Sequence, residues 1–231
     1  MKIGIIGAGN IGGALARRLT RLGHEVAIAN SRGPETLQGL AAETGARPVP
    51  VTEAARGADV VVVTIPQKNV PDLPAGVLDG AAPDAAFVDT GNYYPRHRDG
   101  RIEPLEQGTP ETRWVEQQLG RPLVKAFNNI FAQSLQDNGK PAGEPGRIAL
   151  PVAGDDAAAK AKVMALVDEL GFDAVDAGGL DDSWRQQPGT PVYTKDHDVD
   201  GVRRALAEAT RERTEEFTAT DASPGTFESP A

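Results

Sequence analysis

The first dozen residues hold the feature that most constrains the fold, a complete G-x-G-x-x-G motif directly after a short apolar run. The run covers Ile3 to Ile6, and Gly7, Gly9 and Gly12 are the glycines of the motif. Apolar side chains then recur at helical spacing, from Ile11 to Leu22. This pattern predicts a strand, a tight turn and a helix whose first N–H groups can bind a pyrophosphate. It favours dinucleotide binding over a glycine turn that serves only packing.

The end of the second predicted strand indicates which dinucleotide is preferred. The strand Glu25 to Ala29 leads into Asn30, Ser31 and Arg32. An NAD site usually has a carboxylate about 20 residues after the glycines, where it binds the ribose 2′-OH. Here Asn30 is neutral, Ser31 can donate to a 2′-phosphate, and Arg32 can bind it bidentately. The sequence therefore favours NADP(H), against the alternative that Arg32 is a solvated loop residue.

Composition excludes several classes of function. The chain has 231 residues, with 24 Lys and Arg against 33 Asp and Glu, which gives a formal charge of −9. That balance argues against nucleic acid and anionic membranes as partners. The absence of cysteine removes disulfides, thiolate catalysis and cysteine–zinc sites. No apolar run approaches the ~20 residues of a membrane span, and glycines interrupt the N-terminal strand, so we expect a cytoplasmic protein without a signal peptide.

Apolar runs typical of strands alternate with helical or loop stretches, which predicts an α/β fold. We expect a Rossmann-type doubly wound, mostly parallel sheet with a smaller C-terminal α/β appendage. After the first two strands, further strands are predicted at 46–50, 60–64, 85–89, 123–127, 147–153 and 172–176. Helices are predicted at 35–43, at 155–170 with Asp155 as its N-cap and Gly171 at its end, and at 202–217.

The same patterns divide the chain into three parts. Residues 1–140 are the predicted NADP-binding Rossmann domain, and residues 141–217 are a smaller α/β region packed on it. Residues 218–231 are rich in Ser, Thr, Pro and Gly, which predicts a disordered tail.

Substrates of open parallel sheets bind beyond the carboxyl ends of the strands, and this rule selects three corners of the chain. Thr64, Ile65 and Pro66 follow a buried strand and are expected beside the nicotinamide. Asn92 lies in the polar turn 89–95, which is equally compatible with an ordinary Asx turn. The third corner holds Asn128, Asn129 and Ile130 as candidate substrate-binding residues, with the alternative that Asn129 only caps the next helix.

No residue is assigned as catalytic or as a metal ligand, because no Ser/His/Asp order, paired carboxylates or metal-ligand spacing is recognisable. Hydride transfer between two ring cofactors needs alignment and water exclusion more than a proton donor. Reduction of a ketone or imine would need a general acid, for which Tyr93, Tyr94 and Lys125 are the candidates at the right edge. Trp184, in a polar loop with two prolines, is expected to pack rather than to stack on a cofactor.

With these motifs the chain resembles the NADP oxidoreductases that depend on the deazaflavin coenzyme F420. The resemblance covers most of residues 1 to about 180 and rests on KIGIIGAGNIG, ANSRGPETL, VVVVTIP, VKAFNNI and PVAGDD. In that family the deazaflavin and NADP stack face to face between a larger and a smaller domain, often in a homodimer. The chain differs from the family at Asn128 and Phe131, where members carry a histidine and a proline near the deazaflavin.

The resemblance implies roles for three groups of residues. The pyrophosphate would be held by Gly7, Gly9, Asn10, Ile11 and Gly12. Ser31 and Arg32 would hold the 2′-phosphate, and Thr64, Ile65 and Pro66 would flank the nicotinamide.

Three functions follow as hypotheses. The first is hydride transfer between NADPH and an F420-like deazaflavin or flavin-type partner, with coenzyme F420 as the second substrate. The second is NADPH-dependent reduction of a small carbonyl or imine, with Tyr93 or Tyr94 as proton donor. The third is a non-enzymatic NADP(H)-binding sensor.

Overall fold

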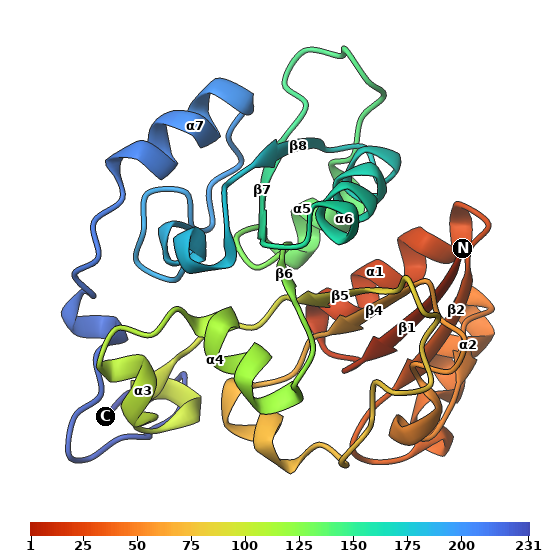
Figure 1. Cartoon of the computed structure of the whole chain (residues 1–231), viewed down its shortest axis with the longest axis horizontal. Helices are drawn as coiled ribbons and strands as arrows, with labels where there is room; N and C mark the ends of the chain where they lie inside the picture. The colour runs from red at the N-terminus through yellow and green to blue at the C-terminus, as the bar shows by residue number, and fades with distance from the viewer.

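A single eight-stranded sheet runs through the molecule, in the order β3-β2-β1-β4-β5-β6-β7-β8 (Figure 1). The structure is a computed structural model and describes residues 1–231. All neighbouring strands are parallel except β6 and β7. The predicted Rossmann-type α/β fold is confirmed. The strands are β1 (Lys2–Ile6), β2 (Glu25–Ala29), β3 (Arg47–Pro48), β4 (Val60–Val63), β5 (Ala86–Asp89), β6 (Val124–Lys125), β7 (Ala149–Gly154) and β8 (Asp173–Asp176).

Helices cover both faces of this sheet, as the continuous apolar strand β4 requires. Val60 and Val62 belong to the core cluster that includes residues of the first and sixth helices, whereas Val61 and Val63 belong to the cluster of the fourth helix. The helices are α1 (Asn10–Arg21), α2 (Gln38–Thr44), α3 (Glu103–Glu106), α4 (Glu111–Leu119), α5 (Ala132–Asp137), α6 (Ala157–Glu169) and α7 (Val199–Glu208).

Strand register brings the candidate site loops to one edge of the sheet. Ile6 of β1 pairs with Ala29 of β2 and with Val63 of β4, and Val63 pairs in turn with Asp89 of β5. Parallel strands that end at the same level release their loops side by side, about 4.8 Å apart. The glycine loop and the loops that begin at Asn30, Thr64 and Thr90 are therefore neighbours.

The last predicted helix is shorter than the sequence pattern suggests. Instead of a helix over 202–217, α7 ends at Glu208, and a separate 3₁₀ turn, η6, covers Glu215–Phe217. Residues 210–216 contain no apolar side chain that could continue the buried face of α7. Phe217, the last residue of the predicted helix, belongs to this turn and is buried beside Tyr94 and Tyr193.

The cap of α6 also differs from the prediction by one residue. Asp156, not Asp155, is the N-cap, and its side chain accepts hydrogen bonds from the N–H groups of Ala158 and Ala159 at 2.9 and 3.0 Å. Asp155 instead accepts from the N–H of Leu180 at 2.8 Å. The carboxylate of Asp155, which precedes α6, therefore joins the start of that helix to the turn η5 (Leu180–Gln186).

The region predicted as an appendage continues the same sheet, because β7 pairs with β6. A small separate core of Val175, Val192 and Val202 lies under α7. The tail 218–231, for which the sequence predicts disorder, contains no helix or strand. It lies against the turn that follows β5, where the N–H groups of Gly225 and Ala231 donate to the carbonyl oxygen of Arg96.

Candidate functional site

The structure constrains the three glycines of the loop after β1 in different ways. Gly7 has a φ of +115°, and a Cβ atom there would overlap the carbonyl oxygen of Thr64. A Cβ at Gly12 would overlap the carbonyl oxygen of Gly7, so the close approach of α1 to the loop requires glycine. A Cβ at Gly9 would meet no atom within 4 Å. The fold therefore does not require glycine at position 9, because a side chain there would point into free space.

The start of α1 offers unpaired donors beside this loop. The first hydrogen bond of the helix runs from the N–H of Gly13 to the carbonyl oxygen of Gly9, at 2.8 Å. The N–H groups of Asn10, Ile11 and Gly12 therefore have no helical acceptor. No acidic side chain lies in the first turn to use them. The positive end of the helix dipole is thus available to an anion.

Asn30 and Thr36 fix the loop after β2. The Oδ1 atom of Asn30 accepts from the N–H of Arg32 at 3.0 Å, and its Nδ2 donates to Oγ1 of Thr36 at 2.9 Å. The Thr36 hydroxyl donates to the carbonyl oxygen of Gly33 at 2.8 Å. The loop is closed by its own polar groups, while the side chains of Ser31 and Arg32 stay exposed and the Arg32 guanidinium has no carboxylate partner.

A groove of about 670 Å³ connects these loops. Its wall includes Gly9 from the glycine loop, Arg32 from the second loop and Thr64 from the loop after β4. Arg32 and Asp72 are the charged residues of this wall. The structure therefore brings most of the predicted coenzyme residues to one groove, namely Gly7, Gly9, Asn30, Ser31, Arg32, Thr64, Ile65 and Pro66.

A second cavity of about 870 Å³ shares Gly9 and Arg32 with this groove and also includes Asn10. It runs along α1 and reaches Phe131, whose side chain is 56% exposed. Arg17 also lines this cavity but is paired with Glu43, at 2.6 Å.

The predicted substrate residues lie apart from both cavities, in the loop after β6. Asn128 is buried and uses all of its amide group: Nδ2 donates to Oδ1 of Asn92 at 3.0 Å and to the carbonyl oxygen of Gln186 at 2.6 Å. Its Oδ1 accepts from Nε2 of Gln186, also at 3.0 Å. Asn92 donates in return to the carbonyl oxygen of Asn128. These three residues join the ends of β5 and β6 to η5.

Two carboxamides near this junction are buried without hydrogen bonds. Asn129 and Gln67 are both fully buried, and neither end of either amide has a partner. Ile130 belongs to the apolar core. Asn128, Asn129 and Ile130 therefore have no surface toward the groove, and their assignment to a substrate stays a prediction.

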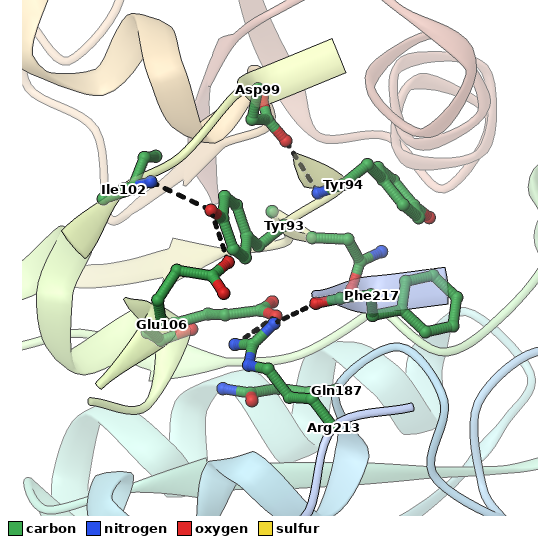
Figure 2. A network of polar contacts seen from close by, with 12 residues as sticks. Tyr93, Tyr94, Asp99, Ile102, Glu106, Gln187, Arg213 and Phe217 are labelled. Carbon is green, nitrogen blue, oxygen red and sulfur yellow. Dashed lines mark hydrogen bonds and ion pairs between the residues drawn. The ribbon is translucent and has the colours of Figure 1, made fainter. Parts of the chain in front are cut away.

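Each candidate proton donor is already engaged. The Tyr93 hydroxyl is buried, donates toward Glu106 or the carbonyl oxygen of Gly100, and accepts from the N–H of Ile102 (Figure 2). Burial raises the pKa of Tyr93 far above its ordinary value. Lys125 is fully buried, donates to the carbonyl oxygen of Gly91 and lies 3.5 Å from Asp89. The half-buried Tyr94 pairs its hydroxyl with that of Tyr193.

Several buried polar residues in this region escaped sequence reasoning. Glu111 has the clearest signal, because it shares a helix face with the buried Trp114 and Val115 at i, i+3 and i+4. Arg213 and Tyr193 come from irregular segments that carry no periodic pattern. Trp184 packs as predicted, between the guanidinium groups of Arg185 and Arg211, at 4.5 and 4.9 Å.

Comparison with known proteins places this geometry in a family. The family described as "NADP oxidoreductase coenzyme F420-dependent" matches residues 2–93. The Escherichia coli protein YjhV is 45% identical over 72 residues, which are 31% of this chain. The chain spans about half of YjhV, since the match covers 53% of that protein. No helix here has the length and apolar character needed to cross a membrane.

Two solved structures resemble the whole fold. The hypothetical protein SMa0349 from Sinorhizobium meliloti is 30% identical, with a TM-score of 0.72 over 85% of this chain and 95% of that one. A candidate F420-dependent NADP reductase from Arthrobacter sp. FB24 is 26% identical, with a TM-score of 0.61 over 78% of this chain and 86% of that one. Residues 2–93 thus form a domain of the coenzyme F420-dependent NADP oxidoreductase type, and the chain as a whole has an NAD(P)-binding Rossmann-type fold.

Proposed function

We propose that the chain binds NADP(H) in the groove lined by the glycine loop, with the 2′-phosphate on Ser31 and Arg32. The observation that carries this proposal is the free guanidinium of Arg32 beside the neutral Asn30, in a chain of net charge −9. A guanidinium without a carboxylate partner supplies two parallel donors to a phosphate. The open space at Gly9 supports it, because the pyrophosphate then reaches the free N–H groups of α1 without a side chain in its way.

Calorimetry with NADPH and NADH tests this assignment. We expect NADPH to bind more tightly, and we expect Arg32→Ala to weaken NADPH binding by tens of fold while NADH binding is unchanged. The control is Arg56→Ala, an exposed arginine that lines a cavity at the opposite ends of the strands. Equal affinity for both coenzymes would contradict the proposal.

We further propose that the reaction is hydride transfer between NADPH and a deazaflavin of the F420 type or a flavin. NADPH supplies the hydride when it is bound, and the chain's own contribution is to align the two rings and exclude water. The family of residues 2–93 supports this choice of partner. So does the engagement of Tyr93 and Lys125, neither of which lines the groove.

Absorbance provides the direct test. Mixing the protein with NADPH and oxidised coenzyme F420 should bleach both chromophores at equal molar rates. If NADPH is consumed only when a flavin replaces coenzyme F420, and the flavin is bleached at the same molar rate, the partner is a flavin. If neither chromophore changes although NADPH binds, hydride transfer to this class of partner is wrong.

The hydroxyl pair of Tyr94 and Tyr193 favours a second candidate, the reduction of a small carbonyl or imine. A phenol that hydrogen-bonds to another phenol can donate its proton to a developing oxyanion and share the charge with its neighbour. Turnover of NADPH with a carbonyl and imine panel, lost in Tyr94→Phe and retained in Tyr93→Phe, would support it. A sensor without enzymatic activity would bind NADPH and turn over nothing.

A further inference from the structure

The chain after α7 covers a cluster of polar and aromatic residues. We call residues 209–219 the cap segment. Of residues 210–216, every side chain is exposed except that of Arg213, which is partly buried, and Phe217 follows with only 8% of its surface exposed. Figure 1 shows this part of the chain in blue beside α3. The cap segment thus inserts two side chains, one aromatic and one cationic, into the molecule.

Phe217 fills a slot with aromatic walls. Its ring lies 6.2 Å from that of Tyr94 and 6.4 Å from that of Tyr193, at interplanar angles of 48° and 80°. A Cβ atom on Gly189 would approach the Phe217 ring to 3.0 Å, so the absence of a side chain there makes room for it. The two tyrosine hydroxyls are paired with each other. The slot therefore accommodates a planar ring, and the paired hydroxyls give it a polar edge.

Arg213 enters beside this slot and meets a buried carboxylate. Its guanidinium lies 5.1 Å from the centre of the Tyr93 ring and 3.4 Å from Oε1 of Glu111 (Figure 2). Glu111 is completely buried, and its other oxygen, Oε2, has no hydrogen bond, with Nζ of Lys125 3.8 Å away. Nε2 of Gln187, also buried, has no acceptor. Buried polar atoms without a hydrogen bond leave hydrogen-bonding capacity that the protein does not use.

Few hydrogen bonds hold the backbone of the cap segment in place. They include one from Nε of Arg96 to the carbonyl oxygen of Thr218, at 3.0 Å, and one from the N–H of Ala219 to Glu106, at 3.2 Å. Besides the two inserted side chains, the segment is held by the guanidinium of Arg211 over the Trp184 ring, at 4.9 Å, and by the buried Ala209 and Ala219. Glu215 pairs with Arg96 but is 89% exposed, and such an ion pair contributes little. No strand pairing or helix secures this segment, so it has the features of a region that opens locally.

We propose that residues 209–219 are a reversible cap, and that Phe217 and Arg213 occupy a binding pocket for a planar aromatic ligand with a cationic or hydrogen-bond-donating group. When such a ligand binds, its ring replaces that of Phe217 beside Tyr94 and Tyr193. Its donor group replaces the guanidinium of Arg213 beside Glu111. Its donor group also reaches Oε2 of Glu111, which accepts no hydrogen bond. The inference goes beyond the proposed coenzyme site and does not depend on which coenzyme binds there.

Hydrogen exchange on the full chain tests the cap. We expect the amides of the cap segment to exchange at least tenfold faster than those of β1, β4 and β5. Phe217→Ala should raise the exchange of the cap segment a further tenfold and leave the sheet unchanged. Phe131→Ala is the matched control, because that ring is 56% exposed, lies at the start of α5 and is not among the aromatic neighbours of Phe217, Tyr94 or Tyr193. Equal protection of cap and sheet, or equal loss in both after Phe217→Ala, would overturn the proposal.

Benzamidine tests the pocket, because it combines a planar ring with an amidinium group. We expect it to bind the full-length double variant Arg213→Ala with Phe217→Ala at least tenfold more tightly than neutral benzamide, and to lose that advantage when Glu111→Gln is added. If the double variant does not fold, the wild-type protein serves, and benzamidine should accelerate exchange in the cap segment alone. Absence of binding by a folded double variant, indifference to Glu111→Gln, or an unchanged wild-type cap would each refute the pocket.

Discussion

The Oδ1 atom of Asn30 accepts a hydrogen bond from the N–H of Arg32, at 3.0 Å, and this contact holds the loop that presents the arginine to the groove. A carboxylate could accept the same hydrogen bond, although it could not donate to Oγ1 of Thr36 as Nδ2 of Asn30 does. The larger difference lies in charge. An aspartate at position 30 would stand next to a bound 2′-phosphate, whereas an asparagine does not repel it.

Asn30→Asp should therefore change coenzyme preference without unfolding the loop. We expect NADPH to bind at least tenfold more weakly, because the new charge opposes about 1–3 kcal/mol of charge-assisted binding at Arg32. NADH binding should improve, since the carboxylate can accept from its ribose 2′-OH. The ratio of the two dissociation constants is the measurement, with the melting temperature as control. An unchanged ratio would show that the 2′-phosphate lies elsewhere.

The glycine loop allows coenzyme binding and folding to be separated. Gly9→Ala places a methyl group in open space at a backbone φ of −75°, which alanine tolerates, so the melting temperature should stay the same while NADPH affinity falls at least tenfold. Gly12→Ala forces a methyl group onto the carbonyl oxygen of Gly7 and should destabilise the protein by about 1–3 kcal/mol. Thermal unfolding and calorimetry on both variants check this contrast. Destabilisation by Gly9→Ala would contradict it.

The elements and the groove could be predicted because their signals are local. A continuous apolar run identified β4, the glycine spacing identified the turn into α1, and the end of β2 identified the loop that presents Arg32. Parallel register then brings those loops together without further information. The predicted C-terminal helix over 202–217 is too long, because no apolar residue lies between Ala209 and Phe217 to continue its buried face.

The capped pocket could not be predicted in the same way. Its parts come from four distant segments, and none of them alone indicates a pocket. Tyr94 follows a predicted strand, Tyr193 lies in a loop, and Arg213 falls within the predicted helix 202–217. Glu111 belongs to the helix α4. Only tertiary packing shows that they meet. Because Glu111 lies on the same helix face as Trp114, the sequence does predict that Glu111 is buried. It does not predict that the guanidinium of Arg213 approaches Glu111.

The junction of Asn128 with Gln186 should contribute to stability. Asn128→Ala removes hydrogen bonds to Asn92 and Gln186 and leaves the buried carbonyl oxygen of Gln186 without this donor. Unsatisfied buried groups cost about 1–3 kcal/mol each, so the free energy of unfolding should fall by at least about 2 kcal/mol. Urea denaturation measures this change. Gln133→Ala, at an exposed position of α5, is the control and should change little.

Glu111 should make stability depend on pH in a direction opposite to that of a paired surface carboxylate. Burial raises its pKa above the ordinary 4.5, although Lys125 and Arg213 oppose the shift. The folded state therefore binds the proton more tightly, and this contribution to stability is complete below pH 4.5 and is lost as pH rises through the folded-state pKa. Relative to Glu111→Gln, the wild-type protein should lose stability as the pH increases from 4.5 to 8. Urea unfolding of both proteins at each pH isolates the group, because their other carboxylates are the same. A constant difference, or one of opposite sign, would mean that Lys125 and Arg213 outweigh burial.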